Sequence, residues 1–183
     1  MSVMPGVRRG VQVAAIKAHR ISSLTLAAAT TWTDWTCEEV VDDESLAGVV
    51  LEADGKTFRI DQPDLYYVSG CVRPLWTGTP GTRVLVATRV VASTDGGTTF
   101  VEKRCLQSVT ERAAQANEVG TQHYMGTVLA HEPGLLVRLQ VWVANVGMTF
   151  AGWSAGFDFP VSGSIQMMGA GQPLDFAHLV GDR

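Results

Sequence analysis

The sequence predicts an all-β protein, a jelly-roll β-sandwich of about ten strands with an extended N-terminal arm. Three observations lead to this prediction. Segments rich in Val, Thr, Tyr and Trp recur at short intervals, turn signals containing Gly, Pro and Asp separate them, and no segment keeps the periodicity of a long helix. The chain has 183 residues, 46% of them hydrophobic, so it can form one sizeable core.

The first 22 residues differ from the rest of the chain and set the domain boundaries. We expect an arm over residues 1–22, a jelly-roll domain over residues 23–171 and a C-terminal tail over residues 172–183. Within the arm, Val11–Ile21 could form a short helix. The arm is otherwise either a disordered tail or a segment that becomes ordered when it binds a neighbour.

The first strands follow from alternation and from one strong turn signal. Thr alternates with Trp and Asp in Ser23–Cys37. The acidic stretch Glu38–Glu44 indicates a solvated loop rather than a cation site, because it lacks EF-hand spacing. The dipeptide Asp-Gly at positions 54–55 separates Gly48–Ala53 from Lys56–Ile60 and predicts a hairpin, with positive φ at both turn positions.

The remaining strands are rich in branched and aromatic residues and are bounded by turn residues. They cover, in chain order, Leu65–Val72, Thr82–Ala92, Thr98–Leu106, Thr121–Ala130, Leu135–Ala144 and Ser162–Ala170. Between them, Gln107–Gly120 has two open interpretations, a long loop or two turns of helix at Val109–Ala116.

Two strands lack the charged face that a solvent-exposed sheet carries. In Leu135–Ala144 an apolar set of branched residues alternates with a mixed polar and aromatic set. The mixed set is Leu136, Arg138, Gln140 and Trp142. Leu65–Val72 divides in the same way, with Tyr66 on one face and Tyr67 on the other. We infer that the inner sheet is covered on both sides, by the domain's own core and by a neighbouring subunit.

Three segments resemble motifs of the tumour necrosis factor and complement globular-head superfamily. FRIDQPDLYYVSGCV, residues 58–72, is similar to the family's F-x-I-x-x-x-G-x-Y-Y-V/F-S motif, although Asp64 stands where the family usually has glycine. EPGLLVRLQVWV, residues 132–143, resembles a later strand, and SIQMMGAG occupies the place of the last one. The resemblance spans roughly residues 24–171 and implies a ten-stranded jelly roll that assembles as a homotrimer.

The resemblance also implies which residues approach the threefold axis. The implied interface residues are Leu65, Tyr67, Ser69, Cys71, Arg138, Gln140, Trp142 and Met167, with the set from Leu135–Ala144 beside the set from Leu65–Val72. Tyr66 would point into the core of the monomer instead. A closed trimer also accounts for a charged fraction of 17%, below the roughly 25% of an average soluble domain.

Charge is unevenly distributed along the chain. Residues 1–20 hold four basic residues and no acidic one, so the rest of the chain holds 10 basic and 18 acidic residues. We expect no nucleic-acid partner, because this acidic body has no Lys/Arg stripe, and no membrane partner, because no apolar run approaches ~20 residues. Three cysteines without short-range pairing, and no secretory signal, favour reduced thiols made in a cytoplasm.

These features predict a structural virion protein. It resembles the homotrimeric decoration or cement proteins of bacteriophage capsids, so its partner would be the major capsid protein and its location the capsid surface. The arm residues expected to contact the capsid are Arg8, Arg9, Lys17 and Arg20. The alternative is a trimeric receptor- or glycan-binding tip of a phage fibre. Its expected contact residues are Trp76, Trp153 and Phe157, since exposed aromatic residues are common binding anchors.

Catalytic and metal-binding chemistry is not predicted. No two of the four histidines share a face, and no cysteine lies at ligand spacing from one, so we expect neither a metal ion nor another cofactor. The sequence contains no nucleophile elbow, P-loop or dinucleotide motif, and we expect no enzyme.

Overall fold

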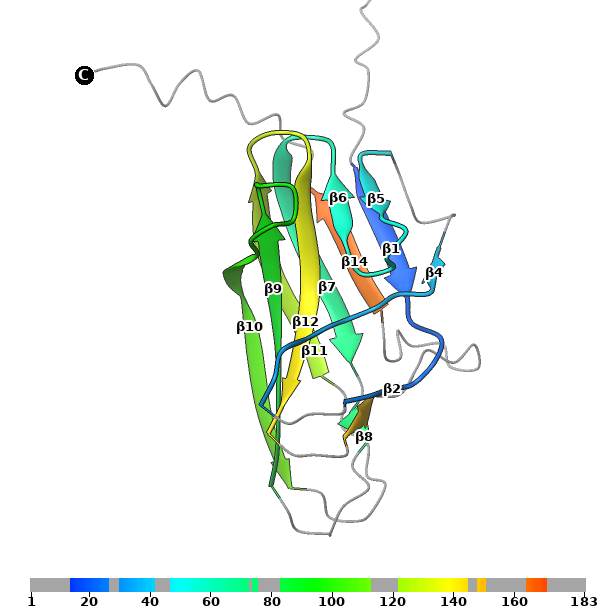
Figure 1. Cartoon of the computed structure of the whole chain (residues 1–183), viewed down its shortest axis with the longest axis vertical. Coiled ribbons are helices and arrows are strands. Elements are labelled where there is room, and N and C mark those ends of the chain that lie inside the picture. The colour runs from blue at the N-terminus through cyan, green and yellow to red at the C-terminus, as the bar shows by residue number, and fades with distance from the viewer. Residues whose placement is uncertain are drawn as a thin grey trace, which may run out of the picture.

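Two antiparallel sheets pack face to face in the computed structural model, which confirms an all-β sandwich (Figure 1). The structure describes residues 14–26, 30–41, 47–72, 74–75, 83–112, 122–144, 148–150 and 164–170. One sheet, called the β7 sheet, has the order β11-β7-β14-β1-β4. The other, called the β12 sheet, has the order β10-β9-β12-β6-β5, and β3 also pairs with β12.

The strand bounds agree with the alternation in the sequence to within a few residues over most of the chain. The β7 sheet comprises β11 (Gln122–Ala130), β7 (Asp64–Val72), β14 (Ser164–Gly169), β1 (Ala15–His19) and β4 (Glu39–Val40). The β12 sheet comprises β10 (Val101–Arg112), β9 (Arg83–Ser93), β12 (Leu135–Val143), β6 (Phe58–Ile60), β5 (Val49–Leu51) and β3 (Thr33–Asp34). A small third sheet joins β2 (Leu24–Thr25), β13 (Thr149–Phe150) and β8 (Pro74–Leu75).

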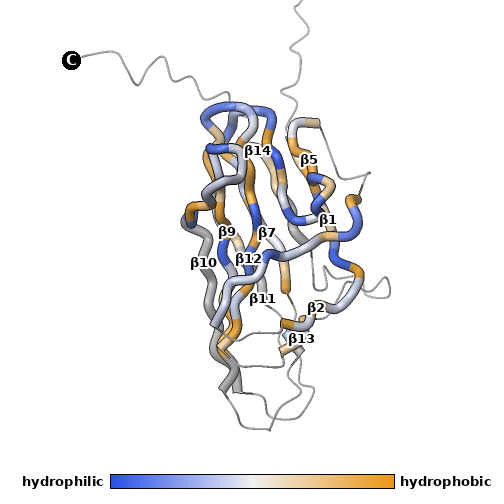
Figure 2. The backbone as a smooth tube through the Cα atoms, viewed as in Figure 1, coloured by the Kyte–Doolittle hydropathy of each residue, from blue (hydrophilic) through white to orange (hydrophobic). Residues whose placement is uncertain are grey.

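The core lies between the two large sheets and is built from alternate residues of each strand. In β12 the branched set is fully buried and the mixed set is half-buried, as the alternation predicts. In β7, Tyr66 and Val68 are fully buried, whereas Tyr67 between them is exposed. Hydrophobic and hydrophilic residues alternate along these strands, while the turns at one end of the sandwich are hydrophilic (Figure 2).

The predicted hairpin at positions 54–55 is confirmed, but its turn is wider than a two-residue loop. Gly55 has φ of +68°, and Asp54 is not among the residues with positive φ. The Asp54 carboxylate accepts the backbone N–H groups of Lys56 and Thr57 at 3.0 and 2.9 Å. These bonds order the turn by an Asx-type contact, and β5 ends before it, at Leu51.

The prediction of an arm over residues 1–22 is wrong for its second half. Ala15–His19 forms β1, which pairs with β14 on one side and β4 on the other. Ala14, Ile16 and Ala18 are buried in the core. Four of the five residues of β1 are buried and the strand is paired on both sides, so neither a helix nor a disordered tail describes it. Residues 1–13 lie outside the described part.

Two other predictions need correction. Ser23–Cys37 is not one strand, because β2 belongs to the small sheet and β3 to the β12 sheet. Thr30, which precedes β3, has φ of +61°, a strained value for a β-branched residue. Within Gln107–Gly120, the first six residues continue strand β10, so neither a helix nor a loop begins there.

Gly169 in β14 permits a close contact that places a carboxylate in the core. A Cβ atom at this position would lie 2.7 Å from Oδ2 of Asp64, whose side chain is buried. It would also lie 3.4 Å from the carbonyl oxygen of Ala14 in the next strand. The absence of a side chain at Gly169 therefore makes room for Asp64.

Gly169→Ala should lower the free energy of unfolding by roughly 1–3 kcal/mol, because the added methyl group overlaps the Asp64 carboxylate. Denaturation with guanidinium chloride measures this cost. The cost should shrink when Asp64→Ala is also present, as a double-mutant cycle reports. Equal costs in both backgrounds would mean that Asp64 is not what Gly169 accommodates.

Candidate functional site

The outer face of the β7 sheet gathers apolar side chains from three neighbouring strands. The pairing places Leu129 of β11 opposite Leu65 of β7, and Met168 of β14 opposite Tyr67. Met125 of β11 lies opposite Ser69, one step further along the same face. We call Leu65, Tyr67, Met125, Leu129 and Met168 the apolar face.

The apolar face is open to solvent in the protomer. The exposed fraction is 45% for Tyr67, 78% for Met125, 39% for Leu129 and 46% for Met168. The described residues include seven exposed large hydrophobic side chains, and these four lie together on one face of one sheet. Such a grouping on a single face marks an interaction surface, whereas scattered exposed residues need no explanation.

The structure separates the expected interface residues of the β7 sheet into accessible and buried ones. Leu65, Tyr67 and Ser69 lie on the outer face and are at least partly exposed. Cys71 follows the same alternation but is fully buried, so it is not available to a partner. Met167 points into the core, because it lies in β14 opposite Val68, and its assignment to the interface is wrong.

The expected adjacency of the two sets is also wrong. Arg138, Gln140 and Trp142 belong to β12, in the opposite sheet from β7. Their side chains alternate with the core residues of β12 and therefore lie on the outer face of the β12 sheet. The two outer faces point away from each other, so these residues cannot lie beside Tyr67 in the same protomer.

The residues that sequence reasoning missed are Met125, Leu129 and Met168. In β11 the larger apolar side chains face outward, and the smaller Val128 and Ala130 face the core. Hydrophobicity alone would place the larger apolar side chains of β11 in the core and the smaller ones outside. The pairing of β11 with β7 is the signal that assigns them correctly, and the sequence does not show it.

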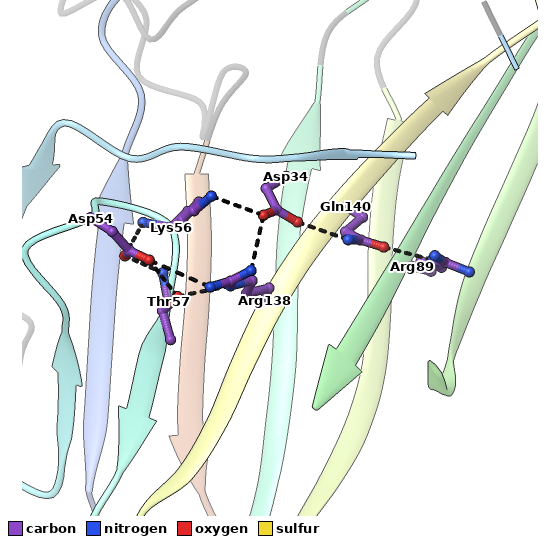
Figure 3. A network of polar contacts seen from close by, with 7 residues as sticks. All are labelled: Asp34, Asp54, Lys56, Thr57, Arg89, Arg138 and Gln140. Atoms are coloured by element: carbon purple, nitrogen blue, oxygen red, sulfur yellow. Dashed lines mark hydrogen bonds and ion pairs between the residues drawn. The ribbon is translucent and has the colours of Figure 1, made fainter. Parts of the chain in front are cut away.

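The outer face of the β12 sheet carries a continuous polar network (Figure 3). The Asp34 carboxylate is its centre, because it accepts Nε2 of Gln140 at 2.7 Å and pairs with Arg138 and Lys56 at 3.2 Å each. Arg138 also donates its Nε–H to the Thr57 hydroxyl at 2.8 Å. Asp34 lies in β3, so this network attaches β3 to the rest of the β12 sheet.

The network continues on the other side of Gln140 to an arginine and two aromatic rings. Nε of Arg89 donates to Oε1 of Gln140 at 2.8 Å, and its Nη1 donates to Glu102 at 3.0 Å. The Arg89 guanidinium lies 4.2 Å from the ring centroid of Trp32. Trp32 in turn contacts Trp142, with ring centroids 6.4 Å apart and planes 42° apart.

Two of the basic residues expected in a capsid-binding arm are part of the folded domain. Lys17 lies within β1. Arg20 is mostly buried, and donates to the carbonyl oxygen of Thr36 at 3.0 Å and to the Ser22 hydroxyl at 3.2 Å. Arg20 therefore cannot reach a capsid, and its assignment is corrected to a structural role.

Glu38 stabilises the segment that follows Arg20. Its Oε2 accepts the backbone N–H groups of Ser22 and Ile21 at 2.7 and 3.0 Å, and its Oε1 accepts the Ser22 hydroxyl. The Ser22 hydroxyl and the two amides hold the pKa of the Glu38 carboxyl below its usual range. Cys37 beside it is a buried thiol, and burial raises its pKa to about 12.

Several expected site residues lie outside the described residues. They are Arg8, Arg9, Trp76, Trp153 and Phe157. Within the described ranges, no group of three or more His, Cys, Asp or Glu side chains is placed to hold a metal ion. Among the same residues, no helix is long and apolar enough to cross a membrane.

Comparison with solved structures assigns the fold to the jelly rolls. The chain is similar to murine APRIL, with a TM-score of 0.53, 14% identity, and coverage of 86% of this chain and 99% of that one. It is also similar to Eiger TNF from S. frugiperda, with a TM-score of 0.60, 10% identity, and coverage of 86% and 92%. The fold is therefore a TNF-like jelly roll, and at this identity the likeness concerns the fold alone. No family model and no curated protein sequence matches the chain.

The lowered pKa of Glu38 predicts an acid-sensitive contribution to stability. The contribution is present above the pKa of an unfolded glutamate, and it is lost as the pH falls through the lower pKa of the folded state. Thermal melts of the wild type and of Glu38→Gln between neutral pH and pH 3 should therefore converge in acid. Parallel curves over this range would show that Glu38 does not contribute in this way.

The network predicts that Asp34→Asn lowers the free energy of unfolding by about 1–3 kcal/mol, because Arg138 and Lys56 then lose their shared anion. Denaturant unfolding measures this loss. Glu102→Gln is the matched control, since it removes one half-exposed pair and should cost less than about 1 kcal/mol. Equal costs for the two variants would argue against Asp34 as the centre of the network.

Proposed function

We propose that the protein is a homotrimeric structural protein that decorates a bacteriophage capsid and stabilises the shell. The observation that carries the proposal is the apolar face of the β7 sheet. Its partner would be a second copy of the chain, and the assembled trimer would then bind the major capsid protein.

Burial of the apolar face supplies the driving force for self-association. Fully burying one large apolar side chain contributes about 1.5–3 kcal/mol, and the face exposes four of them. Association must also offset the lost freedom of the subunits, about 4–15 kcal/mol. Because about half of each side chain is exposed in the protomer, burying the four contributes roughly 3–6 kcal/mol per copy, which reaches the lower part of this range.

The TNF-like fold favours a trimer over a dimer. A twofold dimer would pair two copies of the apolar face, whereas a threefold ring brings three copies of it around one axis. The TNF-like fold supports the ring, since the resemblance in residues 58–72 implies a trimer with Tyr67 near its axis. The low charge content of the chain also fits a body with much of its surface buried between subunits.

Capsid decoration is supported by what a rigid trimer can do. Three identical contacts on one body bind an ordered lattice with avidity, and a protein that binds only the assembled shell stabilises it by mass action. Arg8 and Arg9 stay in the proposal as capsid contacts. Lys17 and Arg20 leave it, because both belong to the folded sandwich. The location would be the outer surface of the virion, after synthesis in the host cytoplasm.

Tyr67→Asp should dissociate the oligomer without unfolding the protomer. A carboxylate buried among apolar side chains costs several kcal/mol, and about 4 kcal/mol raises the dissociation constant roughly a thousandfold. Light scattering should give three times the 19.6 kDa chain mass for the wild type and the single chain mass for this variant. A wild-type monomer would contradict the proposal.

Two variants serve as controls. Val50→Asp places the same charge at an exposed position of β5 in the other sheet, and it should leave the trimer intact. Tyr66→Asp places it at a fully buried position and should unfold the chain, as circular dichroism would report. The capsid role is tested by co-sedimentation with shells prepared without the protein. If wild-type trimers sediment with no shell, the protein forms a trimer but the proposed decoration role is wrong.

A further inference from the structure

We propose that the outer face of the β12 sheet binds a pyranose sugar at a tryptophan corner formed by Trp32, Trp142, Arg89 and Glu102. The corner combines two indole rings with a fixed arginine and a half-exposed carboxylate. It belongs to the sheet opposite the apolar face. The proposal therefore does not depend on the trimer or on capsid binding.

The two indole rings form a surface of the shape and charge that a sugar ring needs. Their planes meet at 42°, with centroids 6.4 Å apart, so they make an open angle rather than a closed stack. Both residues are half-buried, so each keeps some exposed surface, and the Arg89 guanidinium occupies one side of the Trp32 ring. The face of an indole ring is electron-rich, and the C–H groups on one side of a pyranose carry the complementary partial charge.

Polar groups with remaining hydrogen-bonding capacity surround the rings. Arg89 uses Nε for Gln140 and Nη1 for Glu102, and its Nη2 has no partner among the described residues. Within the same part of the chain, neither Trp32 nor Trp142 donates its indole N–H to a protein group. Glu102 is the most exposed side chain of the network and can accept from a hydroxyl. Sugar hydroxyls both donate and accept, so they match this mixed set.

The corner is ordered before any ligand arrives. The Gln140 amide accepts from Arg89 through its oxygen and donates to Asp34 through its nitrogen, which fixes its orientation. Arg89 is thereby held over the Trp32 ring, 4.2 Å from the centroid. A site that is already ordered loses little side-chain freedom on binding, and this favours weak ligands such as single sugars.

A sugar fits this face better than a protein partner does. A protein would have to bury the Arg89–Glu102 and Arg138–Asp34 pairs, and taking paired charges out of water costs free energy. The apolar residues beneath, Val91 and Ala87, are already covered within the protomer. A pyranose needs only one ring face and the edge of the network, so the ion pairs stay partly hydrated.

Binding can be tested with defined oligosaccharides. The intact protein is titrated with cellohexaose, chitohexaose and galactohexaose, followed by tryptophan fluorescence and calorimetry. We expect at least one of them to bind in the micromolar to millimolar range. Trp142→Ala should weaken that binding at least tenfold, Trp142→Phe should retain most of it, and Glu102→Gln should weaken it severalfold.

Further variants and conditions make the outcome decisive. Val50→Asp, on the same sheet but away from the corner, should bind like the wild type, and Tyr67→Asp should do so as a monomer. Absence of binding to all three oligosaccharides overturns the proposal, as does unchanged binding in both Trp142→Ala and Trp32→Ala. Attachment to bacterial envelopes that survives periodate oxidation of their glycans would point to a protein partner and would also overturn it.

Discussion

The segment that contains β3 and the residues just after it is the constraint on which the rest of the sandwich depends. Trp35 enters the core and packs edge-on against Phe150, with ring centroids 5.7 Å apart. Its neighbour Asp34 faces outward and organises the network on the β12 sheet. The backbone adds N–H bonds from Trp35 to Leu139 and from Cys37 to Gly55. Asp34 and Trp35 thus link the outer surface of the sandwich to its interior. Both candidate sites lie on sheets that this link holds in place.

The sequence predicts the individual strands well because alternation is a local property. Each residue of Leu135–Val143 faces the side that its position predicts, and Tyr66 and Tyr67 divide as expected. Membership of a sheet is not local, and for that reason the prediction that β7 and β12 lie side by side is wrong. The sequence does not predict strand β1, because Ala15–His19 is short and contains Lys and His. Its place between β14 and β4 comes from pairing over a long stretch of sequence.

The candidate sites show the same limit at the level of single side chains. Met167 and Met168 are chemically identical, and only the pairing with β7 decides that the first is buried and the second exposed. Trp32 and Trp142 lie far apart in the sequence, and nothing in either segment indicates that their rings meet. Hydrophobic side chains on the β7 sheet and paired charges on the β12 sheet give the two outer faces different physical characters. This difference is the reason for proposing a subunit contact on the first face and a hydrated ligand on the second.

The pairing of β1 with β14 also has a consequence for how the chain folds during synthesis. These strands come from opposite ends of the described chain, yet they are direct neighbours at the centre of one sheet. Two hairpins of the β12 sheet, β5–β6 and β9–β10, can form as they leave the ribosome, whereas β1 must wait until β14 has been made. Contacts between such distant segments carry a large loop-closure cost and slow folding. Until then the unpaired edge of β1 needs protection, and its short length and its Lys17 reduce the chance that it pairs with another nascent chain.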